Sequence, residues 1–366
     1  MADARVIPLH PEDDGGGRAG AGSQGRSAGD GRSAMSGAPG SARERPAARD
    51  DSARDAAAGD SGARDDDDGD HGAGGGEDAE EGTDGGPDWH ETLADLTAFA
   101  RRRLLGQYRV DEFGFDRELT ERFFLPLLRT VYDNWFRVEA VGLHNVPHDS
   151  GALVVANHSG TLPWDALMTT VALHDYHPTG RQLRMLGADV VFGTPLVGAL
   201  ARKTGQTLAC NPDAERLLRG GEIVGVWPEG FKGIGKPFRD RYKLQRFGRG
   251  GFVSAAMRSG VPIVPCSIVG AEEIYPKIGD IRPLARLLGL PYFPVTPFFP
   301  HLGPLGTVPL PSKWYIEFGE PIDTAEHGPE AAEDPMVVFN ISDQVRETIQ
   351  ETIYRLLAQR RTVFFG

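Results

Sequence analysis

The feature that most constrains the fold is an alternation of short apolar runs with amphipathic segments from residue 136 onward. Continuous short apolar runs are typical of strands buried on both faces, and the intervening segments have helical spacing. This alternation predicts an α/β protein with a central, mostly parallel or mixed sheet covered by helices. We expect strands at 136–141, 152–156, 182–186, 206–209, 222–227, 262–269 and 314–318, and helices at 164–174, 195–203, 212–219, 248–259 and 336–359.

The beginning of the chain has a different composition. Residues 1–89 hold 9 Lys and Arg against 21 Asp and Glu, a net charge of −12, whereas all 366 residues together carry −13. Residues 1–88 are rich in Gly, Ala and Asp and have almost no aromatic side chains. Such a segment buries too little apolar surface to offset its conformational entropy, so we predict a disordered acidic tail. An acidic arm that binds a partner is the alternative.

Two helices are expected in residues 89–135, before the domain built around the sheet at 136–366. The first, at 90–105, ends in the basic run 101–103, and the second, at 118–135, contains Pro126, which is expected to kink it. We interpret both helices as packed against the core. A position beside lipid is the alternative.

A His and an Asp follow the second predicted strand. His158 and Asp165 lie in the segment 157–165, directly after the apolar run 152–156. The strand should deliver His158 to the carboxyl end of the sheet, where ligand sites of α/β proteins lie. Asp165 falls in the first turn of the next predicted helix, where a carboxylate is favoured by the helix dipole. The pair can form a general base and the carboxylate that orients it.

Two further segments carry recognisable patterns. A Trp-Pro-Glu-Gly-Phe-Lys-Gly stretch occupies 227–233 at the end of a predicted strand, and Val-Pro-Ile-Val-Pro occupies 261–265. Together with the His segment, in this order and separation, they resemble the glycerolipid acyltransferase family, the bacterial lysophosphatidic acid acyltransferases and their relatives. The resemblance covers roughly residues 130–325 and suggests a divergent branch, because six residues separate His158 from Asp165 where the family usually has four.

The resemblance implies roles for individual residues. His158 would be the catalytic base and Asp165 its orienting partner. Glu229 and Gly230 would shape the acceptor pocket, and Lys232 would bind the acceptor's phosphate in the place where Arg is commoner. Gly205 matches a further acceptor-binding segment of the family, although the Arg expected there is missing.

The function implied is transfer of a fatty acyl group from acyl-CoA or acyl carrier protein to a glycerolipid hydroxyl, in lysophosphatidic acid or a related lysophospholipid. A neutral acylglycerol is the alternative acceptor, favoured by Phe231 and the missing Arg, and a non-catalytic lipid-binding scaffold is the alternative outside enzymes. We expect no metal or cofactor beyond the acyl donor, and no nucleic-acid partner. The basic stretch 236–249 could hold a lipid headgroup or the phosphates of the donor.

The location of the protein is predicted from four features. No run of about 18 apolar residues is present, so no membrane-spanning helix is expected, and no signal peptide is recognised. The two cysteines, Cys210 and Cys266, favour a reducing compartment. The Pro-rich apolar segment 284–306 either folds over the core or lies in a bilayer surface. We expect a cytoplasmic protein bound peripherally at the inner face of the cell membrane.

Overall fold

A computed structural model describes residues 89–160, 162–289 and 292–365. The predicted acidic tail, residues 1–88, lies outside the described residues. The central sheet has seven strands in the order β1-β9-β6-β2-β5-β3-β4. Their bounds are β1 Glu139–Val141, β2 Ala152–Ala156, β3 Leu183–Gly187, β4 Thr207–Leu208, β5 Ile223–Val226, β6 Ile263–Val269 and β9 Tyr315–Phe318.

The sheet is mixed because one pairing runs against the others. Strands β6, β2, β5, β3 and β4 are mutually parallel, while β9 pairs antiparallel to β6 and parallel to β1. Every residue of β2 and β6 is buried, as expected for strands covered on both faces. The predicted α/β class with a mostly parallel or mixed sheet is therefore confirmed.

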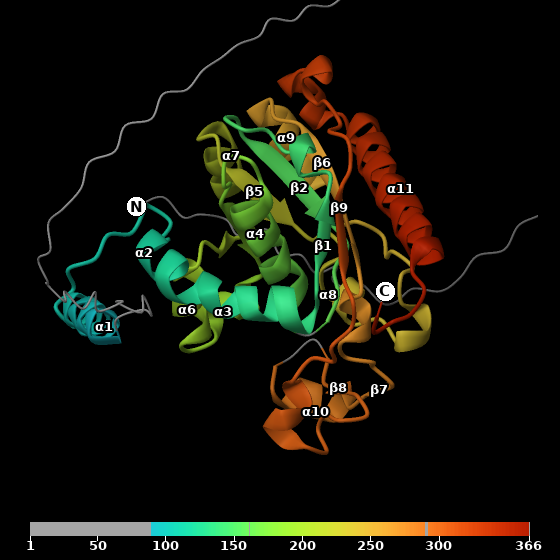
Figure 1. The fold of residues 1–366 in the computed structure, drawn as a ribbon. Coiled ribbons are helices and arrows are strands. Elements are labelled where there is room, and N and C mark those ends of the chain that lie inside the picture. Colours follow the sequence, from blue (N-terminus) through green and yellow to red (C-terminus); the bar gives the residue numbers. More distant parts are fainter. Residues whose placement is uncertain (1–88, 161, 290–291, 366) are drawn as a thin grey trace, which may run out of the picture. The chain divides into compact units, whose positions relative to one another are not determined.

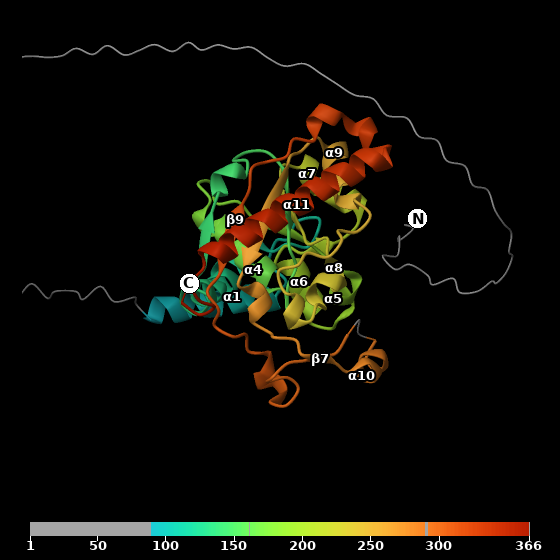
Figure 2. The same ribbon diagram turned by 90° about the vertical axis from the view of Figure 1, so that its right-hand side faces the viewer.

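Helices cover both faces of the sheet (Figure 1). On one face, α4 (Trp164–Tyr176) and α3 (Leu125–Thr130) pack against Ala152, Val154 and Ala156 of β2. On the other, α7 (Asn211–Arg219), α9 (Gly251–Ser259) and α11 (Pro335–Gln359) pack against Leu153 and Val155. In Figure 2, α11 lies in front of the sheet and faces the viewer. The alternation of β2 side chains between the two cores fixes the register of the central strand.

The N-terminal helices follow the predicted positions closely. Helix α1 spans Trp89–Leu104, and the second segment runs without a break through α2 Arg117–Leu119, the π-helical segment η1 Thr120–Phe124, α3, and the π-helical segment η2 Val131–Trp135. Pro126 stands in the first turn of α3, directly after η1. The wider π turn accommodates the missing N–H of proline at this point.

Several short elements lie outside the predicted set. They are α5 Asp189–Gly193, α8 Gly230–Ile234, α10 Arg282–Leu287, and the two-stranded sheet of β7 Gly279–Asp280 and β8 Pro294–Val295. The helix predicted at 195–203 is present as α6 Val197–Lys203 and begins two residues later than expected. Single 3₁₀ turns are η3 Leu143–Asn145, η4 Phe238–Asp240, η5 Ala271–Glu273, η6 Gly303–Thr307, η7 Ala325–His327 and η8 Pro329–Glu333. Within the described ranges, no helix combines the length and apolar character needed to cross a bilayer.

Candidate active site

Asn157, the residue before His158, anchors the carboxyl end of β2. The fully buried Asn157 donates from Nδ2 to the carbonyl of Ile268 at 2.9 Å and accepts the Ile268 N–H at Oδ1 at 2.8 Å. These bonds join the carboxyl end of β2 to the neighbouring strand β6. The next residue, His158, is thus held at the ligand-binding edge of the parallel strands.

His158 and Asp165 form a hydrogen-bonded pair. The distance from His158 Nδ1 to Asp165 Oδ2 is 2.7 Å, and the Asp165 side chain is fully buried while that of His158 is 19% exposed. Asp165 Oδ2 also accepts the Ser159 N–H at 2.9 Å, and Oδ1 accepts the Ala166 N–H at 2.9 Å. The carboxylate is held by these backbone groups and orients the imidazole through Nδ1. The other ring nitrogen, Nε2, has no hydrogen-bond partner among the described residues.

The longer spacing between these residues does not separate their side chains. Gly160 adopts a positive φ of 73°, which an L side chain disfavours, and Pro163 precedes α4. The chain leaves β2, turns at Gly160 and enters α4, which carries Asp165 in its first turn. The family-like pairing therefore survives the two additional residues in the loop.

The Glu229 side chain accepts hydrogen bonds from backbone N–H groups of the protein, one of them that of His158. Its side chain is fully buried, and its carboxylate accepts the His158 backbone N–H at 3.0 Å and the Gln245 N–H at 2.6 Å. Glu229 Oε2 also lies 3.3 Å from Lys236 Nζ. In this geometry Glu229 positions the backbone of the His segment. Its predicted part in acceptor binding stays a prediction.

A buried charge network continues from Glu229. Lys236 Nζ lies 3.0 Å from Glu272 Oε1, and Glu272 Oε2 accepts the Tyr242 N–H at 3.1 Å. Burial raises the pKa of Glu272 to about 7, although the neighbouring Lys236 opposes the shift. The Lys236 ammonium thus lies between two buried carboxylates, that of Glu229 in the turn after β5 and that of Glu272 in the turn after β6.

The other predicted binding residues lie in different environments. Gly230 is exposed at the start of α8 with φ +54°, and Lys232 is exposed on the same short helix. Gly205 precedes the edge strand β4, and its carbonyl accepts from Arg184 Nε at 3.4 Å. The structure brings Gly230 and Lys232 to the edge that carries His158, but not Gly205. The binding roles of these residues stay predictions.

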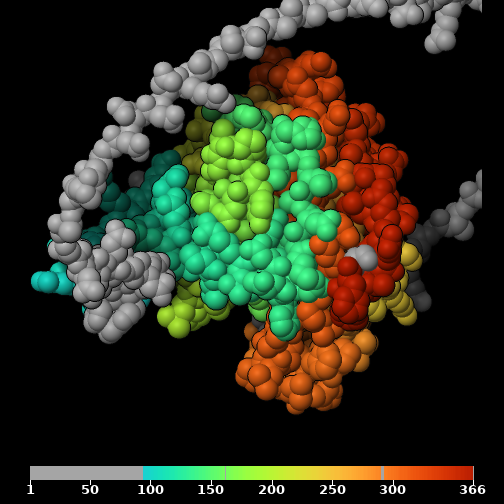
Figure 3. Space-filling view, viewed as in Figure 1, coloured from blue at the N-terminus to red at the C-terminus, as the bar shows by residue number. Residues whose placement is uncertain are grey.

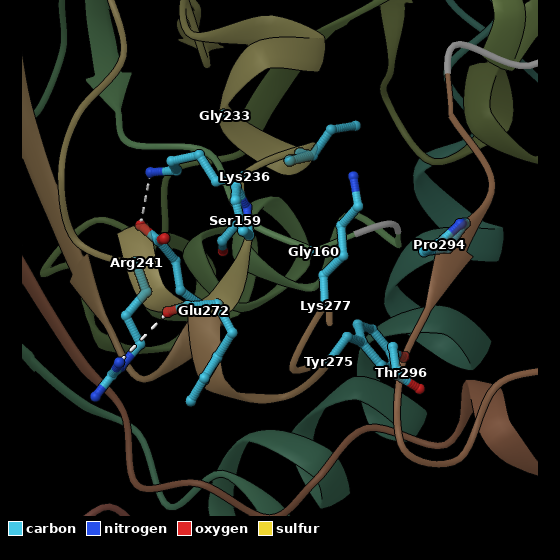
Figure 4. Close-up of a pocket in the computed structure, with 13 residues that line it drawn as sticks. Ser159, Gly160, Gly233, Lys236, Arg241, Glu272, Tyr275, Lys277, Pro294 and Thr296 are labelled. Carbon is cyan, nitrogen blue, oxygen red and sulfur yellow. Dashed lines mark hydrogen bonds and ion pairs between the residues drawn. The ribbon is translucent and has the colours of Figure 1, made fainter. Parts of the chain in front are cut away.

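A small polar crevice of about 30 Å³ opens beside Ser159 and Gly160 (Figure 4). Lys277 lines it, donates from Nζ to the Gly235 carbonyl at 2.8 Å, and lies 4.4 Å from the centre of the Tyr292 ring. Burial lowers the pKa of the Lys277 ammonium. The remaining lining residues are Gly233, Ile234, Lys236, Pro237, Phe238, Arg241, Glu272, Tyr275, Pro294 and Thr296.

The residues after β6 were missed by the sequence reasoning. Glu272, Tyr275 and Lys277 follow a strand that is parallel to β2, and loops after parallel strands meet at the same edge of a sheet. That rule would have placed the loop beside His158. Within residues 89–160, 162–289 and 292–365, no cluster of three His, Cys, Asp or Glu side chains is placed to hold a metal ion. The expectation of no cofactor stays a prediction.

The chain matches known proteins across these segments. The family model described as Acyltransferase matches residues 137–269. An uncharacterized protein of Mycobacterium tuberculosis is 60% identical over 276 residues, which are 75% of this chain and 77% of the relative. A second, from Mycobacterium leprae, is 59% identical over 274 residues, 75% of each chain. The matched residues include the His–Asp pair and the Pro-Glu-Gly turn, and the match shows that the protein is an acyltransferase enzyme.

The chain belongs to the glycerolipid acyltransferase family. The bovine "DGAT1/2-independent enzyme synthesizing storage lipids" is 23% identical over 190 residues, 51% of this chain and 53% of that protein. The crystal structure of the 1-acyl-sn-glycerophosphate (LPA) acyltransferase PlsC from Thermotoga maritima is 19% identical, with a TM-score of 0.45 over 75% of this chain and 95% of that one.

Proposed function

We propose that this enzyme transfers a fatty acyl group from a thioester donor to a glycerolipid hydroxyl, with His158 as the general base. The hydroxyl oxygen attacks the thioester carbonyl carbon while His158 Nε2 takes its proton. The tetrahedral intermediate then breaks its C–S bond, and the imidazolium returns the proton to the departing thiolate. The observation that carries this proposal is the 2.7 Å bond from Asp165 to Nδ1, which leaves Nε2 unpaired among the described residues.

The test is an acyl-transfer assay with the full-length protein. Purified enzyme receives labelled acyl-CoA or acyl carrier protein and a panel of lysophospholipids and acylglycerols, and products are identified by mass. His158→Ala should lower turnover by about 10²–10⁴-fold, the usual contribution of a general base. A folded His158→Ala protein with near-normal turnover would show that His158 is not the general base.

The acceptor we propose is lysophosphatidic acid or a related lysophospholipid. Lys232 is exposed at the edge of the sheet that carries His158, where a cation can meet a phosphate. Lys232→Ala should raise the KM for lysophosphatidic acid, with a smaller effect at high salt because screening grows. A neutral acylglycerol is the second candidate, supported by Phe231 in place of a small residue. For that acceptor Lys232→Ala should change little.

We propose peripheral binding to the membrane through the lobe formed by β7, α10, β8 and η6. Figures 1 and 3 show the part of this lobe around β7, β8 and α10 as an orange region that projects below the other described residues. It exposes several large apolar side chains, and its Pro294 and Thr296 border the crevice beside Ser159. These exposed residues are Leu287, Leu288, Phe298, Leu302 and Leu305. Side chains of this kind can enter the headgroup boundary of a bilayer and bring the site to its lipid substrate.

Substitution of the exposed leucines tests the membrane proposal. Leu287 and Leu305 are 81% and 72% exposed, so Leu287→Ser with Leu305→Ser should leave the melting temperature unchanged. Binding to vesicles and activity on vesicle-held acceptor should fall, while activity on a detergent-dispersed short-chain acceptor should not. Unchanged vesicle binding would refute the proposal. The cysteines are free, which supports our proposal that the bound membrane face is the cytoplasmic one.

A further inference from the structure

The buried cluster of Glu229, Lys236 and Glu272 holds one cation and two carboxylates (Figure 4 shows Lys236 and Glu272). The side chain of Glu229 is fully buried, and those of Lys236 and Glu272 are each 5% exposed. The three N–H groups of the ammonium meet three acceptors, namely Glu229 Oε2 at 3.3 Å, Glu272 Oε1 at 3.0 Å and the Lys243 carbonyl at 3.2 Å. Because burial of ions costs desolvation, such a cluster is weak evidence of added stability. The groups that the cluster holds therefore indicate its role.

The two oxygens of Glu229 accept different backbone N–H groups. Oε1 accepts from His158 at 3.0 Å, and Oε2 accepts from Gln245 at 2.6 Å. The ionised carboxylate is the form that accepts at both oxygens, since protonation turns one of them into an O–H donor. Burial disfavours this charged form, and a neighbouring ammonium favours it. Lys236 therefore supplies the charge with which Glu229 can hold the His158 backbone.

The same cluster holds the segment 242–245. Glu272 Oε2 accepts the Tyr242 N–H at 3.1 Å. Tyr242 has a φ of 64°, a conformation that L residues disfavour and that persists where the surroundings impose it. Since Glu229 binds Gln245 at the other end of this segment, the cluster fixes a strained stretch of chain and the His segment in one arrangement.

Glu272 is the carboxylate of the cluster that loses its charge as the pH falls. Burial raises its pKa to about 7, although Lys236 opposes the shift. Below about pH 7 the cluster therefore balances one ammonium against one carboxylate, that of Glu229. Other titratable or charged side chains on the neighbouring elements are those of His158 with Asp165, Arg241, Tyr242, Tyr275, Lys277, and Glu273 with Arg360.

We propose that Lys236 is a positioning residue that acts on His158 through Glu229. The inference rests on the proposed function, in which His158 is the general base. The ammonium keeps Glu229 ionised, Glu229 holds the His158 backbone N–H, and the imidazole stays directed at the reacting hydroxyl. Replacement of the ammonium by a neutral side chain should therefore change turnover more than substrate binding, and should do so more at low pH than at high pH.

The test variant is Lys236→Met with Glu272→Gln, which removes the cation and leaves the second carboxylate in a neutral form. Lys236→Met alone would leave two buried carboxylates without a counter-charge and should unfold. Lys236→Gln with Glu272→Gln is the second variant, because an amide nitrogen can donate to Glu229 without carrying charge. The matched control is Arg360→Met with Glu273→Gln, since both side chains of this neighbouring ion pair are 4% exposed.

The backbone amide signal of His158 reports the bond to Glu229 without turnover. Full-length protein is labelled with ¹⁵N-histidine, and the signal that is missing in His158→Ala identifies the residue. In Glu229→Gln the signal has the position typical of a neutral acceptor at every pH. The pH at which the signal leaves that position should be about 1–3 units higher in both Lys236 variants than in wild type or control.

Turnover should follow the same titration. Where the amide signal has the neutral-acceptor position, kcat of both Lys236 variants should be about ten-fold or more below wild type, with little change in KM, and should recover as the pH rises. An unshifted amide titration, a shift with unchanged kcat, or an equal loss in the control overturns the role of Lys236. A shifted titration in a protein that transfers no acyl group would instead sink the proposed function and leave the hold of Lys236 on Glu229 standing.

Discussion

Asp165→Asn tests the catalytic pair most sharply, because the substitution keeps the shape of the side chain and removes its charge. The Asp165 carboxylate accepts three N–H groups, from His158 Nδ1, Ser159 and Ala166. An amide offers one oxygen in place of two. At least one buried donor must then face the amide nitrogen, which should destabilise the fold by about 1–3 kcal/mol.

The effect on turnover should be larger than the effect on stability. In the transition state His158 carries a positive charge, which the carboxylate stabilises by about 4 kcal/mol at a separation near 4 Å and an effective dielectric constant of about 20. Loss of that attraction lowers the rate by about 10³-fold. If the amide turns its nitrogen toward His158, Nδ1 must accept a hydrogen bond, and Nε2 then carries the proton and cannot act as a base.

The assay compares turnover and thermal unfolding of the variant with those of a matched control. Asp175 lies in the same helix and pairs with His174 Nδ1 at the same 2.7 Å, but it is partly exposed and also bonds Arg129. Asp175→Asn should therefore cost some stability and leave turnover unchanged. If Asp165→Asn stays within about three-fold of wild type, or if both variants lose activity equally, the assigned base and orienter are wrong.

Three further outcomes are expected. Glu229→Gln leaves one acceptor oxygen for the His158 and Gln245 N–H groups. The unfolding free energy should therefore fall by about 1–3 kcal/mol, and turnover should fall with it. An unchanged melting temperature would contradict this prediction. The folded-state pKa of Glu272 is raised, so its stabilising contribution is present below about pH 4.5 and is lost as the pH rises through about 7. Glu272→Gln should therefore gain stability relative to wild type between pH 5 and 8, measured by melting across that range, and a constant difference would refute the shift. Removal of residues 1–88 should leave stability and specific activity nearly unchanged, since that composition has no apolar face to pack, and an inactive truncated protein would contradict this.

Much of the fold was predictable because its strands are local apolar runs. Each of the seven predicted strands has a counterpart in the sheet. For β2 and β6 the reason is that a strand buried on both faces needs an unbroken apolar segment. The antiparallel entry of β9 between β1 and β6 was not predictable, because no local pattern encodes which distant strands pair. The short helices α5, α8 and α10 were missed because they contain too few turns to show a period.

The short-range pair in the site was predictable, but its long-range contacts were not. His158 and Asp165 are close in sequence, and their pairing follows from a strand end and a helix start. The bonds from Glu229 to His158 and from Lys236 to Glu272 join residues 71 and 36 positions apart. Such contacts depend on the assembled sheet, and the sequence carries no spacing signal for them. The loop after β6 needed only the rule that parallel strands end at one edge.

The placement of Glu229 beneath His158 has a consequence for the order of folding. Its carboxylate joins the chain after β2 to the chain after β5 and to Gln245, so the His segment is fixed only when all three have met. Contacts of such long sequence separation form late, because the loops between them must first close. Partly folded chains should therefore lack an oriented base. A newly made chain should not cleave acyl thioesters until its sheet is complete, and activity should appear together with the slowest refolding phase.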